Sequence, residues 1–368
     1  MNDVGPAWTG RVLLAGAVAV LFVSACGSST DASTHAAVSG ATVPLGPLPA
    51  PPSGPTPASD TATTTIRTDV APTADPNSPL TPVVSPSSTP ATATVAPLQG
   101  CARVTSTATI DGRVVNIESP ETTSPAAVIV AVHGYKGTPE GLAHYSSLTT
   151  LADAGMAMVL YPAGAPLDLG FGWNSGATKF ATTAADDVAV LSDIVDEALT
   201  LPCADPSRVY LVGESNGGGM VLRAACDTRL AGRLSGIVLV NPAIDAGVLS
   251  TCSPIVPTIP VLAVAGALDR VVGFDGSRKP FIAAESWFGS VASIVSGCAG
   301  SSPRVVSLHV IAHDGSGCAS CATLYAIDDG GHTWPGAADA VNGAAIGSFP
   351  LTDVLGRAVT RAVNGCGA

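Results

Sequence analysis

A serine near the middle of the chain stands in a pattern that suits nucleophilic catalysis. Ser215 is the third residue of 213–217, which reads G-E-S-N-G and fits the pattern G-x-S-x-G. An apolar run at 208–212 precedes it and a run of small residues at 216–226 follows, which predicts a strand, a sharp turn and a helix. Glycine at 213 and 217 lets such a turn form without clashes, and the serine hydroxyl then projects from the end of a sheet. We predict that Ser215 is a nucleophile.

A serine nucleophile needs a base, and three histidines follow Ser215 along the chain. His309 lies within a predicted strand, which favours a structural role, and His313 lies in a polar loop, which favours a solvated side chain. His332 lies in a glycine-flanked loop directly after the predicted strand 323–327. That loop belongs to the same end of a parallel sheet as Ser215, so we predict that His332 is the base.

The base in turn needs a carboxylate that orients it. Asp269 follows the predicted strand 261–265 after a short Gly-Ala-Leu turn. Asp245 follows the preceding strand, one strand too early, and reads as a cap or a surface charge. Asp275, six residues after Asp269, is the main rival. The predicted catalytic residues are Ser215, Asp269 and His332.

An ester oxygen that gains negative charge needs hydrogen-bond donors. Asn216 begins the predicted helix after the serine, where backbone N–H groups are free to donate. Tyr135 follows His133 and Gly134, directly after the apolar strand predicted at 126–132. We assign the two donors to the backbone N–H groups of Asn216 and Tyr135; the alternative is that the His133-Gly134 segment is only a tight turn.

Two of the four tryptophans, Trp173 and Trp334, fall in loops expected at the same end of the sheet. As walls of a cleft they would favour aromatic acyl groups or stacking on a sugar ring, and we predict that both bind substrate. The alternative is that each indole packs its own loop.

The elements that must position these residues alternate between strand and helix. Strands are expected at 126–132, 156–161, 208–212, 237–240, 261–265, 305–311 and 323–327, with an entry strand or hairpin over 107–117. Helices are expected at 143–154, 186–199, 216–226 and 351–363. This order predicts an α/β fold with a mostly parallel, doubly wound sheet and helices on both faces.

Composition divides the 368 residues into three parts. Residues 12–23 are apolar but too few for a membrane span, and they lead into Val-Ser-Ala-Cys26, which resembles the lipobox of bacterial lipoproteins. We expect 1–26 to be a signal peptide ending in the lipidated Cys26, which would anchor the exported protein to the cell membrane. Residues 27–99 hold 14 of the 30 prolines and predict a disordered tether. Residues 100–368 form the catalytic domain.

Eight cysteines remain after Cys26, an even number that suggests up to four disulfides in an exported protein. The strand before Ser215 runs away from Cys203, and the helix after Ser215 runs back antiparallel to it and ends near Cys226. Both cysteines are then expected at the same edge of the sheet, which predicts the pair Cys203–Cys226. A weaker prediction joins Cys298 to Cys318 or Cys321. The Cys-x-x-Cys at 318–321 lacks a second ligand pair, so no metal site is expected.

Three stretches of the sequence resemble one group of enzymes. They are 208–220, 260–272 and Gly-Gly-His-Thr-Trp-Pro-Gly at 330–336, and they look like the secreted poly(3-hydroxybutyrate) depolymerase and feruloyl/acetylxylan esterase group of α/β hydrolases. The resemblance covers about 101–366 and implies that fold and ester substrates. The chain departs from it at Tyr135, where many members have cysteine, and no polymer-binding domain follows 366.

These observations predict an extracytoplasmic serine esterase that acts on short-chain, feruloyl or acetyl esters through an acyl-enzyme, without a cofactor. Its partners are a small-molecule or polysaccharide-linked ester and, through the lipid alone, the membrane. A net charge of −12 argues against nucleic acid. The alternatives are a polyhydroxyalkanoate depolymerase, a serine peptidase of the prolyl-oligopeptidase type, whose elbow also favours Ser-Asn-Gly-Gly, and a non-enzymatic envelope lipoprotein.

Overall fold

The computed structural model describes residues 100–180, 185–337, 339 and 343–360. The predicted signal peptide with Cys26 and the predicted tether 27–99 lie outside the described residues, as does the end of the chain from 361 onward. Among the helices of the described part, none has the length and apolar character needed to cross a membrane.

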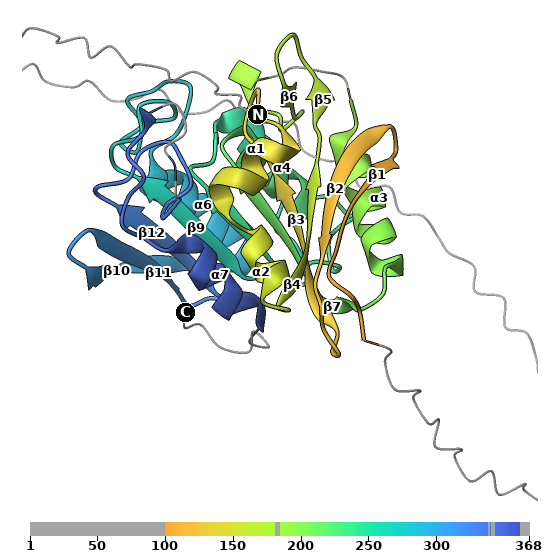
Figure 1. The fold of residues 1–368 in the computed structure, drawn as a ribbon. Helices are drawn as coiled ribbons and strands as arrows, with labels where there is room; N and C mark the ends of the chain where they lie inside the picture. The colour runs from red at the N-terminus through yellow and green to blue at the C-terminus, as the bar shows by residue number, and fades with distance from the viewer. Residues whose placement is uncertain (1–99, 181–184, 338, 340–342, 361–368) are drawn as a thin grey trace, which may run out of the picture. The chain divides into compact units, whose positions relative to one another are not determined.

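A ten-stranded sheet runs through the domain (Figure 1). From one edge to the other it consists of β1 (Val104–Ile110), β2 (Arg113–Ser119), β4 (Ala157–Pro162), β3 (Ala126–Val132), β7 (Ala204–Glu214), β8 (Gly236–Val240), β9 (Val261–Gly266), β12 (Ala322–Ile327), β11 (Val310–Ser316) and β10 (Gly300–Ser307). The strands from β4 to β12 are mutually parallel, and an antiparallel pair flanks them on each side. The parallel strands therefore end at one common edge, where the loops after them meet. A short ribbon of β5 (Ala165–Pro166) and β6 (Phe171–Gly172) is separate from this sheet.

Helices cover both faces of the sheet, as predicted (Figure 1). One face packs against α3 (Asp187–Thr200), α4 (Asn216–Ala225) and α6 (Ala284–Ser296), and the other against α1 (Pro139–Ser146), α2 (Thr149–Asp153) and α7 (Leu351–Thr360). A short helix, α5 (Ala246–Ser250), follows β8. Side chains alternate along β3, so that Val128 and Val130 join the first core and Ala127 and Ile129 the second. This double burial explains why the central strands are apolar without interruption.

Two predicted elements are wrong in detail. The single helix expected at 143–154 is divided into α1 and α2 at Ser147, whose φ of 55° ends α1. The single strand expected at 305–311 is a hairpin that joins β10 to β11. Apolar residues of this hairpin lie on the surface, with Val305 and Leu308 78% and 87% exposed.

The predicted disulfide Cys203–Cys226 is wrong. The bonds formed are Cys101–Cys203 and Cys226–Cys252. Cys203 precedes β7 and faces the start of β3, because its carbonyl accepts the Ala126 N–H at 2.7 Å. Cys226 follows α4, which connects β7 to β8. Because β3 and β8 lie on opposite sides of β7, α4 leads away from the side where Cys203 lies. The prediction compared heights along the sheet and omitted this sideways displacement.

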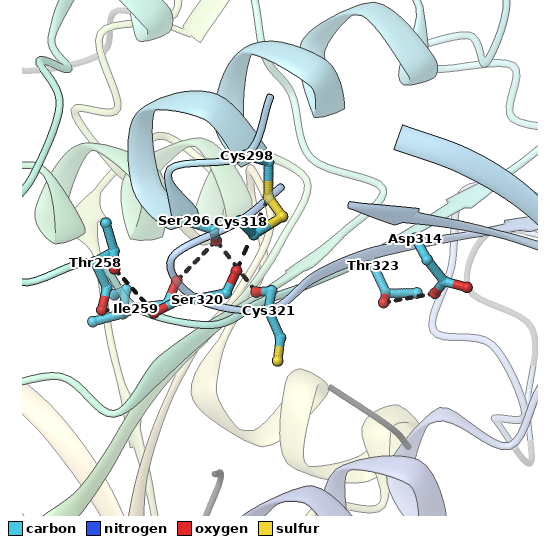
Figure 2. Close-up of a disulfide and its surroundings, with 9 residues drawn as sticks. All are labelled: Thr258, Ile259, Ser296, Cys298, Asp314, Cys318, Ser320, Cys321 and Thr323. Carbon is cyan, nitrogen blue, oxygen red and sulfur yellow. Dashed lines mark hydrogen bonds between the residues drawn. A yellow bond between two sulfur atoms is a disulfide. The ribbon is translucent and has the colours of Figure 1, made fainter. Parts of the chain in front are cut away.

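A third disulfide, Cys298–Cys318, agrees with the weaker prediction (Figure 2). Beside it the buried Ser296 hydroxyl donates to the carbonyl oxygens of Ile259 at 2.8 Å and Cys321 at 3.2 Å. Cys321 directly precedes β12, and Ile259 lies two residues before the start of β9. Ser296 therefore joins two segments at the edge opposite the one where the parallel strands end.

Candidate active site

The turn at Ser215 is as sharp as the sequence predicts. Ser215 connects β7 to α4 with φ 53° and ψ −118°, a conformation that L-residues rarely adopt. Its N–H donates to the Val240 carbonyl at 2.9 Å, which holds the turn against β8. A Cβ at Gly213 would lie 2.3 Å from the Gly217 carbonyl oxygen, and one at Gly217 would lie 2.2 Å from the Val132 carbonyl oxygen. Both positions therefore require glycine.

The structure brings Ser215, Asp269 and His332 together at the common edge of the sheet. Ser215 follows β7, Asp269 follows β9 and His332 follows β12. The distance from Ser215 Oγ to His332 Nε2 is 2.9 Å, and the distance from His332 Nδ1 to Asp269 Oδ2 is 2.7 Å. In the neutral tautomer with the proton on Nδ1, Asp269 accepts that proton's hydrogen bond and Nε2 accepts the serine hydroxyl.

The pKa shifts of Asp269 and His332 favour a shared proton on the His332 ring and not on the Asp269 carboxylate. Burial alone would raise the pKa of Asp269, but the bond to His332 and the N–H donors of Val271 and Val272 outweigh it and lower that pKa. Burial alone would lower the pKa of His332, but the bond and charge of Asp269 and the charge of Glu214 outweigh it and raise that pKa. This arrangement can therefore stabilise a positively charged His332 beside Asp269.

A second carboxylate lies directly before the serine. Glu214 is 5% exposed, and burial raises its pKa. The Tyr145 hydroxyl, from α1, donates a hydrogen bond to Glu214 Oε2. No pattern in the sequence marks Tyr145, because a tyrosine at the end of a helix is consistent with ordinary packing.

The segment after β3 lies against the serine. A Cβ at Gly134 would be 3.3 Å from Ser215 Cβ, so the backbone at Gly134 lies directly beside the serine side chain. The His133 ring fixes this loop, because Nδ1 donates to the Gly134 carbonyl at 2.8 Å and Nε2 accepts the Gly164 N–H at 3.1 Å. Burial lowers the pKa of His133 to about 4, so the ring is neutral at pH 7. That Tyr135 and Asn216 donate to an oxyanion stays a prediction.

The predicted substrate-binding role of Trp173 and Trp334 is wrong. Their side chains are 0% and 1% exposed, which leaves no surface for a substrate. Trp173 Nε1 donates to the His133 carbonyl at 3.0 Å, and Trp334 Nε1 donates to Thr352 Oγ1 at 3.0 Å. An indole can be buried when its single N–H finds one acceptor, and the His133 carbonyl and the Thr352 hydroxyl of α7 supply these acceptors.

Trp173 instead connects the loops around the serine. Its backbone N–H donates to Asn216 Oδ1 at 2.8 Å, and Asn216 Nδ2 donates back to the Trp173 carbonyl at 3.1 Å. With the indole bond to His133, these contacts tie the Trp173 loop to both the start of α4 and the segment after β3.

The rival residues have other partners. His309 pairs with Asp328 at 2.7 Å on the surface, and His313 lies 3.6 Å from Glu285. Asp245 caps α5 through the Val248 N–H and also binds Thr178. Asp275 accepts the Ser277 N–H. Within the described part of the chain, no cluster of three His, Cys, Asp or Glu residues is arranged to hold a metal ion.

Residues 175–259, which include the serine turn, match a protein-family model described as alpha/beta hydrolase fold. The protein has the α/β-hydrolase fold. This confirms the predicted fold class.

Two relatives match parts of the chain. Feruloyl esterase B of Piromyces equi is 33% identical over 129 residues, which cover 34% of this chain and 23% of the relative. The putative esterase NocK of Nocardia uniformis subsp. tsuyamanensis is 31% identical over 163 residues, which cover 41% of this chain and 42% of the relative. The chain thus spans less than half the length of either. Among solved structures, acetyl xylan esterase from Aspergillus awamori aligns with a TM-score of 0.47 and 14% identity, over 62% of this chain and 94% of that one.

Proposed function

We propose that this protein is a serine esterase that hydrolyses carboxylic esters through an acyl-enzyme. The observation that carries the proposal is the hydrogen-bonded series Ser215–His332–Asp269, which begins at a serine held with positive φ at the start of a helix. Both relatives described above are named as esterases, which supports an ester as the substrate.

In the proposed mechanism Ser215 Oγ attacks the ester carbonyl carbon while His332 Nε2 takes the hydroxyl proton. Asp269 stabilises the imidazolium, and the backbone N–H groups of Asn216 and Tyr135 bind the oxyanion. Collapse of the tetrahedral intermediate breaks the bond to the alcohol, which leaves with the proton from His332. Water then attacks the acyl-serine in the same way and releases the acid.

The substrates we propose are short-chain, acetyl or feruloyl esters. Leu268 and Val271 flank Asp269 with 53% and 43% of their side chains exposed, and these apolar surfaces suit the hydrocarbon part of an ester. The buried Trp173 and Trp334 give no reason to prefer an aromatic acyl group. A polyhydroxyalkanoate is the alternative substrate.

We also propose that the enzyme works outside the cytoplasm and is anchored by a lipid on Cys26. Three disulfides among the described cysteines support an oxidising compartment. The variant Cys26→Ser is expected to move from the membrane fraction to the soluble fraction when the protein is expressed in a bacterium. An unchanged membrane fraction would contradict the anchor.

The test of the esterase proposal is a substrate panel with wild type and Ser215→Ala. It contains p-nitrophenyl acetate and butyrate, methyl ferulate, a polyhydroxybutyrate film and a prolyl peptide. Wild type should cleave the soluble esters, and Ser215→Ala should lose about 10⁴-fold or more in kcat. Ser296→Ala, a buried serine at the opposite edge of the sheet, is the control and should keep wild-type kcat. Cleavage of the peptide alone, or activity retained by Ser215→Ala, would contradict the proposal.

A further inference from the structure

Asn241 lies directly after β8, between the strand that carries the serine and the strand that leads to Asp269. Its backbone N–H donates to the Val264 carbonyl at 2.8 Å, which extends the pairing with β9 by one residue. The preceding Val240 carbonyl accepts the Ser215 N–H at 2.9 Å. The side chain of Asn241 is 1% exposed, and its φ is 42°. Asn241 is thus attached directly to Val240, the residue whose carbonyl holds the serine turn.

The buried amide of Asn241 connects the two other segments of the triad. Its Nδ2 donates to the carbonyl oxygens of Gly331 at 3.2 Å and Thr333 at 2.8 Å, the two neighbours of His332. Its Oδ1 accepts the N–H of Gly266 at 2.9 Å, the last residue of β9 and three residues before Asp269. The Asn241 side chain therefore binds the residues on either side of His332 and also the end of β9, from which the loop to Asp269 begins.

The backbone at His332 depends on this support. The Thr333 N–H donates to the Gly331 carbonyl at 3.0 Å, so His332 stands at the centre of a three-residue turn. The Gly331 N–H also donates to the Ala345 carbonyl at 2.7 Å, which anchors the residue before His332. A loss of Asn241 would leave the Gly331 and Thr333 carbonyls and the Gly266 N–H without the side-chain partner that joins this turn to the end of β9. A displacement of about 1 Å in a reacting group can cost on the order of 100-fold in rate.

We propose that Asn241 is the positioning residue of the triad, because its amide fixes the His332 turn to the segment that precedes Asp269. This inference rests on the proposed esterase function and extends it to a residue that does not touch the reacting atoms. Asn241 acts through the 2.9 Å contact of His332 Nε2 with Ser215 Oγ, which its three hydrogen bonds hold in place.

The first test variant is Asn241→Gly. Glycine adopts positive φ without strain, so the change removes the side chain and leaves the backbone at 241 relaxed. We expect kcat for p-nitrophenyl acetate at pH 8 to fall about 100-fold while KM changes by less than about threefold, because substrate binding does not involve Asn241.

A pH profile separates positioning from a loss of folded protein. His332 faces Asp269 from the loop after β9 and Glu214 from the end of β7, and Tyr145 of α1 contacts Glu214. A looser turn weakens the His332–Asp269 bond, which normally holds the pKa of His332 up. In Asn241→Gly the midpoint of the acid limb of kcat/KM should therefore move to lower pH. A smaller amount of active enzyme would scale the profile without moving its midpoint.

Two further variants complete the experiment. Asn241→Asp keeps the shape and the acceptor for Gly266 but, as a carboxylate, cannot donate to Gly331 or Thr333, so it should also lose most of its kcat at pH 8. Ser296→Ala removes a buried side chain that donates to two carbonyls at the opposite edge of the sheet, and it should keep the kcat and the pH midpoint of wild type.

The outcomes are distinguishable from failure of the esterase proposal itself. Wild-type kcat in folded Asn241→Gly or Asn241→Asp, with Ser215→Ala inactive, would overturn the inference about Asn241 alone. Failure of both Asn241 variants to fold would overturn it too, since Asn241 would then be required for stability. Ester hydrolysis retained by Ser215→Ala would instead overturn the proposed function.

Discussion

Replacing Asp269 with asparagine changes one atom and should disable the triad. Asp269 Oδ1 accepts the backbone N–H groups of Val271 at 2.7 Å and Val272 at 3.0 Å, while Oδ2 lies 2.7 Å from His332 Nδ1. In Asp269→Asn the oxygen must stay on the two N–H donors, because an amide NH₂ there would face them donor to donor. The NH₂ group then points at His332 Nδ1, which must act as the acceptor and carry no proton.

That tautomer places the histidine proton on Nε2, the atom that must take the proton of Ser215. We expect kcat to fall about 10⁴-fold, which corresponds to about 5.4 kcal/mol in the barrier. KM should change little, because the carboxylate of Asp269 contacts His332 and not the ester.

The assay is steady-state hydrolysis of p-nitrophenyl acetate by purified wild type, Asp269→Asn and Asp275→Asn. Asp275 is the carboxylate that the sequence offered as a rival, and in the structure it accepts the Ser277 N–H at 2.9 Å. Asp275→Asn should therefore keep wild-type kcat. A kcat of Asp269→Asn within tenfold of wild type would refute the reasoning, as would an equal loss in the Asp275 control.

Two other predictions concern pH and stability. Hydrolysis needs neutral His332, so activity should fall as the pH drops through the raised pKa of His332. The variant Glu214→Gln removes one negative charge that raises this pKa, so it should move the midpoint of the kcat/KM profile to lower pH. An unmoved or higher midpoint would contradict the electrostatic role of Glu214. Cys101→Ser/Cys203→Ser opens a bond that spans 102 residues and should cost about 4.7 kcal/mol of unfolding free energy, against about 3.5 kcal/mol for Cys226→Ser/Cys252→Ser, which spans 26. Urea unfolding measures the free energy of unfolding of the two double variants. A larger loss in Cys226→Ser/Cys252→Ser than in Cys101→Ser/Cys203→Ser would contradict the chain-entropy reasoning.

The turn at Ser215 was predictable because local steric rules demand it. Gly213 and Gly217 each stand where a Cβ would overlap a backbone oxygen, so their spacing around Ser215 carries structural information. Asp269 and His332 were found because the loops after parallel strands share one edge of the sheet. The positions of the strands and loops along the chain, which an apolar pattern does give, were enough to place these two side chains at the same edge of the sheet as the serine.

Other features depend on contacts that the pattern does not encode. Trp173 was expected at a cleft wall, but its indole finds an acceptor in the His133 carbonyl and is buried. The partner of Cys203 depends on the lateral order of β3, β7 and β8, which spacing along the chain does not give. Asn241 has no motif at all, and only the three hydrogen bonds of its side chain reveal it.

The most direct test of the acyl-enzyme is intact mass spectrometry after reaction with a fluorophosphonate, with peptide mapping of the adduct. The proposed mechanism predicts one phosphonate per protein, located on Ser215, which is lost in Ser215→Ala and strongly slowed in His332→Ala because the hydroxyl then has no base. Labelling of wild type on another residue, or labelling that persists in Ser215→Ala, would contradict the central claim that Ser215 is the nucleophile of this protein.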